Sequence, residues 1–204
     1  MKIKNLIALT IAIIILALIA FAIFWHNKEP IQVVIQAGHE GRNSGNTGAY
    51  ANGISEVKWN IYVANEIAKQ LKQWDIKYKR VGAKPTLLKA KIAIAIHFDG
   101  AKKSCSSGAS VGYKNKESKE FAKRWKELYS KYYPFNWQKD NFTKNLSDYY
   151  GYYYIDAKKF LVLELGEITC AKEAKWLKAH LKKIAKMIAY TIARELGYMP
   201  RRPF

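Results

Sequence analysis

Acidic residues are scarce in this sequence of 204 residues: 16 Asp and Glu stand against 35 Lys and Arg, which gives a formal net charge of +19. Such an excess attracts polyanions such as nucleic acid, anionic lipid head groups and acidic cell-surface polymers. The lysines are spread along the whole chain, and no zinc-knuckle spacing, aromatic RNA-binding signature or basic zipper is present. We therefore expect no nucleic-acid partner, and anionic wall polymers or lipid head groups instead.

Cysteine is almost absent too, and internal repeats and low-complexity tracts are missing. Cys105 and Cys170 have neither CxxC nor Cys-His spacing, which argues against a cysteine metal site. A disulfide between them fits an oxidising compartment, and two free thiols fit the sequence equally well, because their separation in space cannot be read from it.

Charge is missing altogether from residues 6–25, where Thr10 is the one polar side chain, and two lysines precede this run. At about 1.5 Å per residue in a helix, the run is long enough to cross a bilayer. It predicts a retained membrane anchor, or a signal peptide cut near the small-x-small site Ala20-Phe21-Ala22. Both alternatives place the remainder of the chain outside the cytoplasm, in the periplasm or at the cell surface.

The rest of the chain alternates between β-branched apolar runs and amphipathic segments. This alternation predicts an α/β fold: one domain over residues 31–204 with a mostly parallel mixed central sheet flanked by helices, after an N-terminal segment and linker over residues 1–30. We expect strands at 31–36, 76–81, 91–96, 110–113 and 160–165, helices at 55–74, 118–132 and 171–196, a loop at 38–53 and an irregular aromatic segment at 134–150.

Four polar residues lie at the ends of these predicted elements. His39 follows the first strand in a Gly-His-x-Gly turn, His97 and Glu164 end later strands, and Glu56 opens the first helix after the capping residue Ser55. Because the carboxyl ends of parallel strands share one edge of a sheet, we expect these four side chains to meet in one crevice.

Two histidines and one glutamate are a ligand set that catalytic zinc sites use, leaving a position for water, and a further carboxylate is needed to move protons. His39, Glu56 and His97 would be the ligands, and Glu164 the acid/base. Each has a plainer alternative: Glu56 as a charge stabilising a helix N-terminus, the histidines as ordinary loop or strand-end residues, and Glu164 as an ion-pair partner. Glu167 is an alternative acid/base.

Four segments in order resemble the motifs of zinc-dependent N-acetylmuramoyl-L-alanine amidases, the enzymes of cell-wall autolysins. They are residues 35–41 (IQAGHEG), 53–56 (GISE) with Asn60 in the following helix, 94–99 (IAIHFD) and 161–166 (LVLELG). The resemblance extends over nearly all of residues 31–196. It implies one Zn²⁺ per chain held by His39, Glu56 and His97, with Glu164 as the catalytic acid/base. It also implies cleavage of the amide between N-acetylmuramic acid and L-alanine in peptidoglycan.

The sequence departs from the family pattern at three positions. Gln36 stands where the first motif has an aspartate, Glu40 where it has a glycine, and Glu167 where the last motif has an aromatic residue. Such positions affect the hydrogen bonds around a metal and the shape of the pocket.

Two other functions remain open at this point. One is a catalytically inactive, membrane-tethered module that binds or regulates the cell wall, and the other is a zinc-free polyanion-binding protein. A host autolysin and a phage lysin would share the same chemistry. For the substrate, Arg42 and Arg80 are candidates to bind stem-peptide carboxylates.

Overall fold

The computed structural model describes residues 10–18 and 31–203. Residues 10–18 form an exposed helix, so most of the apolar segment expected over residues 6–25 lies outside the described residues. Within the described ranges, every helix is too short or too polar to traverse a bilayer. The chain from Ile31 onward is a separate compact unit, and it carries all four candidate residues.

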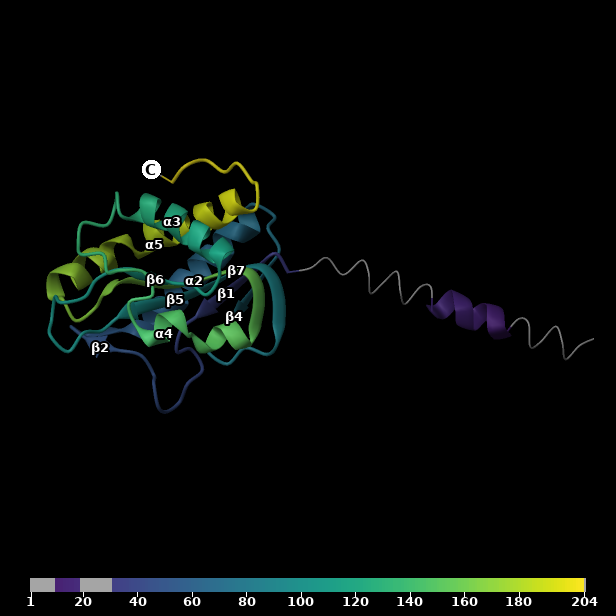
Figure 1. Cartoon of the computed structure of the whole chain (residues 1–204), viewed down its shortest axis with the longest axis horizontal. Coiled ribbons are helices and arrows are strands. Elements are labelled where there is room, and N and C mark those ends of the chain that lie inside the picture. The colour runs from purple at the N-terminus through teal and green to yellow at the C-terminus, as the bar shows by residue number, and fades with distance from the viewer. Residues whose placement is uncertain (1–9, 19–30, 204) are drawn as a thin grey trace, which may run out of the picture. The chain divides into compact units, whose positions relative to one another are not determined.

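A five-stranded sheet forms the centre of this unit (Figure 1). Its strand order is β4-β1-β5-β7-β6, and β1, β4, β5 and β7 run parallel while β6 pairs antiparallel with β7. The predicted single α/β domain with a mostly parallel mixed sheet is therefore confirmed. In chain order the elements are β1 (Val33–Ala37), β2 (Tyr50–Ala51), β3 (Ile54–Ser55), α2 (Glu56–Gln73), β4 (Tyr78–Val81), β5 (Leu88–Asp99), β6 (Ser110–Gly112), α3 (Lys116–Tyr129), α4 (Lys144–Ser147), η1 (Tyr150–Tyr153), β7 (Ile155–Glu167) and α5 (Ala171–Glu195).

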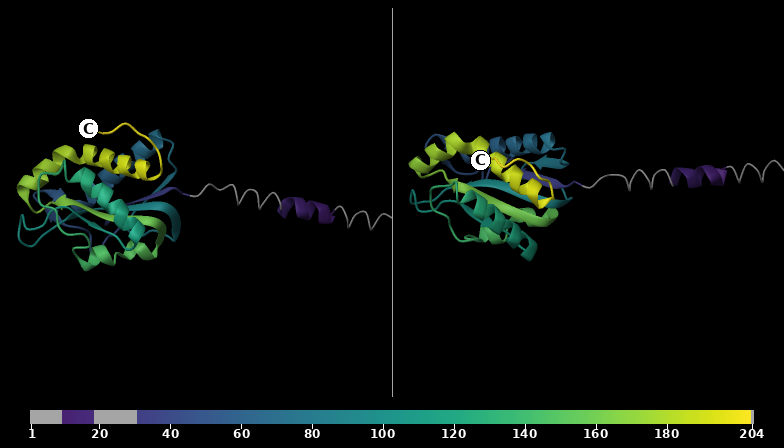
Figure 2. Two further views of the ribbon diagram at one scale, coloured as in Figure 1. Left: turned by 45° about the horizontal axis from the view of Figure 1, so that its top comes forward. Right: turned by 90° about the horizontal axis from the view of Figure 1, so that it is seen from above.

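The two faces of the sheet carry cores of different thickness. Alternate side chains of β1, β5 and β7, such as Ile35, Ile94 and Leu163, pack with α2, α3 and α5 in the larger core. Each such buried aliphatic side chain contributes about 1.5–3 kcal/mol. The opposite face, called the thinner face below, bears small residues, including Ala93 and Ala95, and is covered by α4 and the segment around η1. In Figures 1 and 2 the long helices α3 and α5 lie on one side of the sheet and the shorter α4 on the other.

The loop expected over residues 38–53 contains part of a hairpin that the sequence patterns did not predict. Strand β2 pairs antiparallel with β3 across Asn52 and Gly53, which both have positive φ, as a tight hairpin turn requires. Ser55 occupies the N-cap of α2 as expected, but its side chain makes no capping hydrogen bond. Glu56, the first residue of α2, therefore follows this hairpin directly.

The structure resolves the open question of the two cysteines. Cys105 and Cys170 form a disulfide that joins the loop after β5 to the residue before α5, with their Cα atoms 4.5 Å apart. Both lie beyond the carboxyl ends of neighbouring strands β5 and β7, and the bridge fastens the loop at that end of the sheet to α5.

Candidate active site

The alternation of side chains along β5 and β7 brings two of the candidate residues together. His97 and Glu164 are partners in the parallel register of these strands, so both side chains project from the thinner face of the sheet. Their neighbours on β5 toward the larger core are Ile96 and Phe98, which are almost fully buried. A shift of register by one residue would turn both polar groups into that apolar core.

His39 is held by an unusual turn after β1. Its φ is 65°, in the left-handed region that few non-glycine residues adopt, and such backbone conformations concentrate at functional sites. Its Nδ1 lies 2.9 Å from the carbonyl oxygen of Asn46. Because a carbonyl can only accept, Nδ1 carries a proton and Nε2 is turned toward Glu56.

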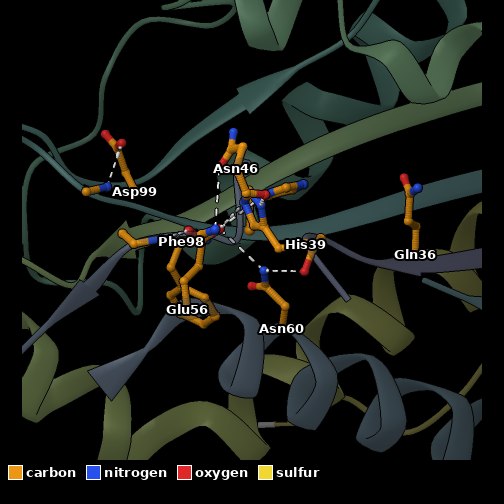
Figure 3. A network of polar contacts seen from close by, with 12 residues as sticks. Gln36, His39, Asn46, Glu56, Asn60, Phe98 and Asp99 are labelled. Atoms are coloured by element: carbon orange, nitrogen blue, oxygen red, sulfur yellow. Dashed lines mark hydrogen bonds and ion pairs between the residues drawn. The ribbon is translucent and has the colours of Figure 1, made fainter. Parts of the chain in front are cut away.

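Glu56 is the acceptor around which the site is arranged. Its Oε1 lies 3.0 Å from His39 Nε2 and 3.2 Å from His97 Nδ1, and Oε2 accepts the backbone N–H of Ala49 at 2.8 Å. Asn60, one turn along α2, donates its side-chain amide to Oε1 of Glu56 and to the carbonyl oxygen of Gly38. Figure 3 shows Glu56 and Asn60 reaching from α2 toward His39. This carboxylate is thus more than a charge at a helix N-terminus.

The donor set fits a metal ion. His39, Glu56 and His97 are all buried, and each offers one ligand atom within 4.8 Å of the other two. The two imidazole nitrogens and the carboxylate oxygen are the ligand types of catalytic zinc sites. The structure thus brings together the three residues that the sequence singled out as ligands.

The charges of the three groups are strongly coupled. Burial raises the pKa of Glu56, but hydrogen bonds from His39 and His97 reverse this and hold the pKa far below its usual value. Burial lowers the pKa of His39, but the hydrogen bond and charge of Glu56 outweigh burial and raise it. For His97, burial prevails and its pKa is lowered. An ionised Glu56 and a neutral His97 are the forms in which these groups bind a cation, whereas the raised pKa of His39 means that a cation must displace a proton from it.

Glu164 borders the same cavity and has different surroundings. Its Oε2 atom is buried and has no hydrogen-bond partner within the described structure. Burial, reinforced by the charges of Glu56 and Asp99, raises the pKa of this carboxyl well above its usual value. Glu164 is therefore a carboxyl that binds a proton readily, next to the three convergent donors.

The carboxylate of Glu167, the alternative acid/base, is engaged in hydrogen bonds outside the cavity. Glu167 is fully buried, and its two carboxylate oxygens accept the backbone N–H groups of Cys105 at 2.8 Å and Ser107 at 2.6 Å. It is absent from the cavity lining. This geometry suits a residue that holds the disulfide-bearing loop, and Glu164 is the glutamate that faces the cavity.

The cavity has a volume of about 420 Å³ and opens at the carboxyl end of the sheet. Besides the candidate residues, its walls come from the loop after β1, the end of β5 and the segment around α4. Arg42, one of the two arginines named as candidates to bind stem-peptide carboxylates, lines it. Arg80 does not: it forms an ion pair with Glu40 and hydrogen-bonds Asn65.

Two residues that contact the histidines were not identified as such from the sequence. Tyr149 belongs to the irregular aromatic segment expected at 134–150, which was interpreted as a surface segment flanking the site. It is 6% exposed, and its hydroxyl lies 3.1 Å from His97 Nε2. Asn46, which orients His39, lies in the glycine-rich loop without any distinguishing pattern. The cluster of tyrosines at 149–154 was the one available signal for the first.

Three-ligand centres of histidine and carboxylate that leave room for water are typical of metal-dependent hydrolases, and that is the class to which this fold and site point. Residues 33–194 match the family model described as N-acetylmuramoyl-L-alanine amidase. The chain belongs to this family, and its function is that of a peptidoglycan amidase, so the alternative of an inactive wall-binding module is not favoured.

Solved structures agree on the fold. The catalytic domain of CwlV, an N-acetylmuramoyl-L-alanine amidase from Bacillus (Paenibacillus) polymyxa var. colistinus, is 20% identical with a TM-score of 0.65, over 82% of this chain and 99% of that chain. AmiC2 of Nostoc punctiforme is 16% identical with a TM-score of 0.64, over 82% and 97%. An amidase from Clostridium difficile 630 is 18% identical with a TM-score of 0.62, over 84% and 99%. No curated protein sequence matches the chain.

Proposed function

We propose that this amidase cleaves the amide between the lactyl group of N-acetylmuramic acid and L-alanine with one zinc ion held by His39, Glu56 and His97. The observation that supports this most is the convergence of three buried donors on one point beside a carboxyl group, that of Glu164, with a buried oxygen. Zinc accepts this combination of nitrogen and oxygen ligands and keeps a position for water.

The ligands are prepared for a cation by their neighbours. Glu56 is ionised, and the N–H groups of Ala49 and Asn60 hold its carboxylate in place. His39 directs Nε2 to the site because its Nδ1–H is engaged by Asn46. When bound, zinc polarises the scissile carbonyl and activates water for attack at neutral pH.

Glu164 then serves as general base and general acid. Its carboxylate accepts a proton from the attacking water as the new C–O bond forms. The carboxyl group returns that proton to the alanine nitrogen as the C–N bond breaks. A raised pKa favours the second step, because the carboxyl group retains the proton until the nitrogen accepts it.

The substrate would bind in the cavity that Arg42 lines, with the guanidinium facing a stem-peptide carboxylate. The formal net charge of +19 would hold the protein against anionic wall polymers or lipid head groups. Contact with the wall requires a location outside the cytoplasm, and cell-wall amidases act there.

Residues 1–30 form, in this proposal, the export segment and linker, and residues 31–204 form the catalytic domain. Support comes from the charge-free run at residues 6–25 and the lysines before it. Retention of the run would tether the amidase to the membrane, and cleavage would release it.

The test is hydrolysis of purified peptidoglycan by the full chain, followed by labelling of the free L-alanine amino termini that cleavage exposes. Glu164→Gln is expected to lower the rate by about 10²–10⁴-fold, the usual contribution of a general acid/base, while zinc content stays at one per chain. Glu167→Gln is the matched control, because it replaces a buried glutamate of the same strand that does not line the cavity.

Full activity of Glu164→Gln would remove Glu164 from the mechanism. Loss of activity in Glu167→Gln alone, with its fold and zinc content intact, would transfer the role to Glu167. A folded wild-type chain that releases no L-alanine termini would contradict the amidase function itself.

A further inference from the structure

A chain of hydrogen bonds leads away from His97 on the side opposite Glu56. His97 Nε2 lies 3.1 Å from the hydroxyl oxygen of Tyr149, and that hydroxyl lies 3.0 Å from Gln36 Oε1. Gln36 is 0% exposed and Tyr149 6% exposed, so water does not compete for these contacts. Both side chains belong to the thinner face of the sheet, where Ala93 and Ala95 leave room for the tyrosine ring.

The far end of this chain sets the orientation of the Gln36 amide. Gln36 Nε2 lies 3.2 Å from the carbonyl oxygen of Gly82 and 3.1 Å from the hydroxyl of Tyr150. The Tyr150 hydroxyl lies 2.7 Å from the carbonyl oxygen of Ala83. Since both carbonyls can only accept, Tyr150 donates to Ala83 and the NH₂ group of Gln36 donates to Tyr150 and Gly82.

The direction of every other bond follows from this. The oxygen of the Gln36 amide faces Tyr149, so the Tyr149 hydroxyl must donate to it. A hydroxyl has one proton, and Tyr149 can therefore only accept from His97. A cation bound by His97 and Glu56 would replace the hydrogen that Nδ1 of His97 shares with Glu56 Oε1. The remaining proton of the neutral imidazole is then held on Nε2 by Tyr149, and the Nδ1 lone pair faces the cation.

We propose that Tyr149 and Gln36 are positioning residues that select the Nε2–H tautomer of His97, so that Nδ1 is the nitrogen that binds the metal. The inference deepens the proposed function and rests on its assignment of His97 as a ligand. It gives the site two histidines of opposite tautomer: His39 is protonated on Nδ1 by its contact with Asn46, and His97 on Nε2 by its contact with Tyr149. Hydrogen bonds to the outer nitrogen are what orient metal-binding histidines in general.

The arrangement also gives a physical role to a departure in the sequence. The family motif has an aspartate at position 36, and a carboxylate there would offer only acceptors. Gln36 accepts from Tyr149 and donates to both Tyr150 and Gly82. The amide therefore joins the tyrosine beside His97 to the backbone after β4, with all its polar atoms satisfied.

The first test is the tautomer itself, measured by long-range ¹H–¹⁵N NMR on the ¹⁵N-histidine-labelled, zinc-loaded full chain. We expect the His97 ring to carry its proton on Nε2 and the His39 ring on Nδ1, so that each serves as internal reference for the other. A zinc-loaded wild-type protein in which His97 is protonated on Nδ1 would overturn the inference.

The second test is zinc affinity, measured by competition with a chromophoric chelator. Tyr149→Phe keeps the ring and removes the acceptor, and it is expected to weaken zinc binding by about 10–100-fold. Gln36→Met removes the acceptor of the Tyr149 proton and frees that hydroxyl to donate to His97, so affinity should fall as well. Tyr152→Phe is the matched control: its hydroxyl donates to the Leu146 carbonyl at 2.9 Å and its ring packs against Tyr149.

The control should bind zinc like the wild type, because it loses a tyrosine hydroxyl bond of the same cluster without touching His97. Unchanged zinc affinity in folded Tyr149→Phe, or an equal loss in Tyr152→Phe, would contradict the positioning role. These outcomes leave the proposed function intact, whereas a folded wild type without zinc would overturn the proposed function and the inference together.

Discussion

Gly38 is the position at which the smallest change should disable the metal site. A Cβ atom there would lie 2.2 Å from His97 Cε1, 2.4 Å from Nε2 and 2.6 Å from Nδ1, where ordinary contact begins at 3.4 Å. The shortfall at Cε1 is 3.4 − 2.2, or about 1.2 Å, so the ring must move by roughly that distance.

Neither the Gly38 backbone nor the His97 ring can move easily to relieve this clash. The N–H of Gly38 donates to the carbonyl of Ile96 at 3.0 Å, and its own carbonyl accepts from Asn60 at 3.0 Å. The His97 ring is held between Glu56 and Tyr149. Overpacking of this kind costs about 1–3 kcal/mol of stability, and a displacement of about 1 Å in an active site lowers the rate about 10²-fold.

We therefore expect Gly38→Ala to fold with reduced stability, to bind zinc more weakly and to hydrolyse peptidoglycan about 100-fold more slowly. The assays are urea unfolding, chelator competition and release of L-alanine amino termini. Gly197→Ala is the control: at φ 89° it has no neighbour within 4 Å of the added Cβ, so it loses roughly 1–2 kcal/mol through backbone strain alone. Normal zinc binding and normal hydrolysis in Gly38→Ala would refute the packing argument.

Three further predictions concern stability and substrate. Replacing Cys105 and Cys170 by alanine should lower the free energy of unfolding by about 2–4 kcal/mol, because the bridge closes a loop between residues 65 apart, and an unchanged urea midpoint would contradict this. Burial raises the pKa of Glu195, but hydrogen bonds from two cationic side chains outweigh it and the pKa is lowered. The stabilisation from ionised Glu195 is thus complete above the usual glutamate pKa of 4.5 and is lost as pH falls through the lower pKa of the folded state. Glu195→Gln should therefore reduce the loss of unfolding free energy in this acid range, measured with chelator present. An identical acid range in the variant would show that Glu195 does not contribute to this pH dependence. Arg42→Ala should raise KM about tenfold for muropeptides with a free stem-peptide carboxylate and leave KM unchanged for the amidated form, as a charged hydrogen bond implies; equal KM changes for both would remove Arg42 from carboxylate binding.

The apolar runs of the sequence predicted the sheet well where burial on both faces leaves a continuous signal. The buried parts of β1, β5 and β7 were found, and α5 was placed almost to the residue because its apolar positions recur at helical spacing. The beginnings of β5 and β7, such as Leu88–Ala90, were missed because they alternate between half-buried and exposed side chains. The two-residue strands β2 and β3 are too short for any periodicity, although Asn52-Gly53 is a hairpin signal.

The site was predictable to the extent that strand ends and motif order determine it. His39, Glu56, His97 and Glu164 follow from those features. The contact of Tyr149 with His97 does not, because it joins residues 52 apart through a segment without regular periodicity. The pairing of Cys105 with Cys170 likewise depends on how two loops meet in space, which composition and spacing leave open.

The most direct test of the central claim is the position of the metal in crystals of the zinc-loaded full chain, located by anomalous diffraction at the zinc edge. We expect one zinc ion per chain, bound by His39 through Nε2, by Glu56 and by His97 through Nδ1, with the Glu164 carboxyl facing it. A folded chain that takes up no zinc, or one whose zinc is bound by other residues, would contradict the proposed metal site.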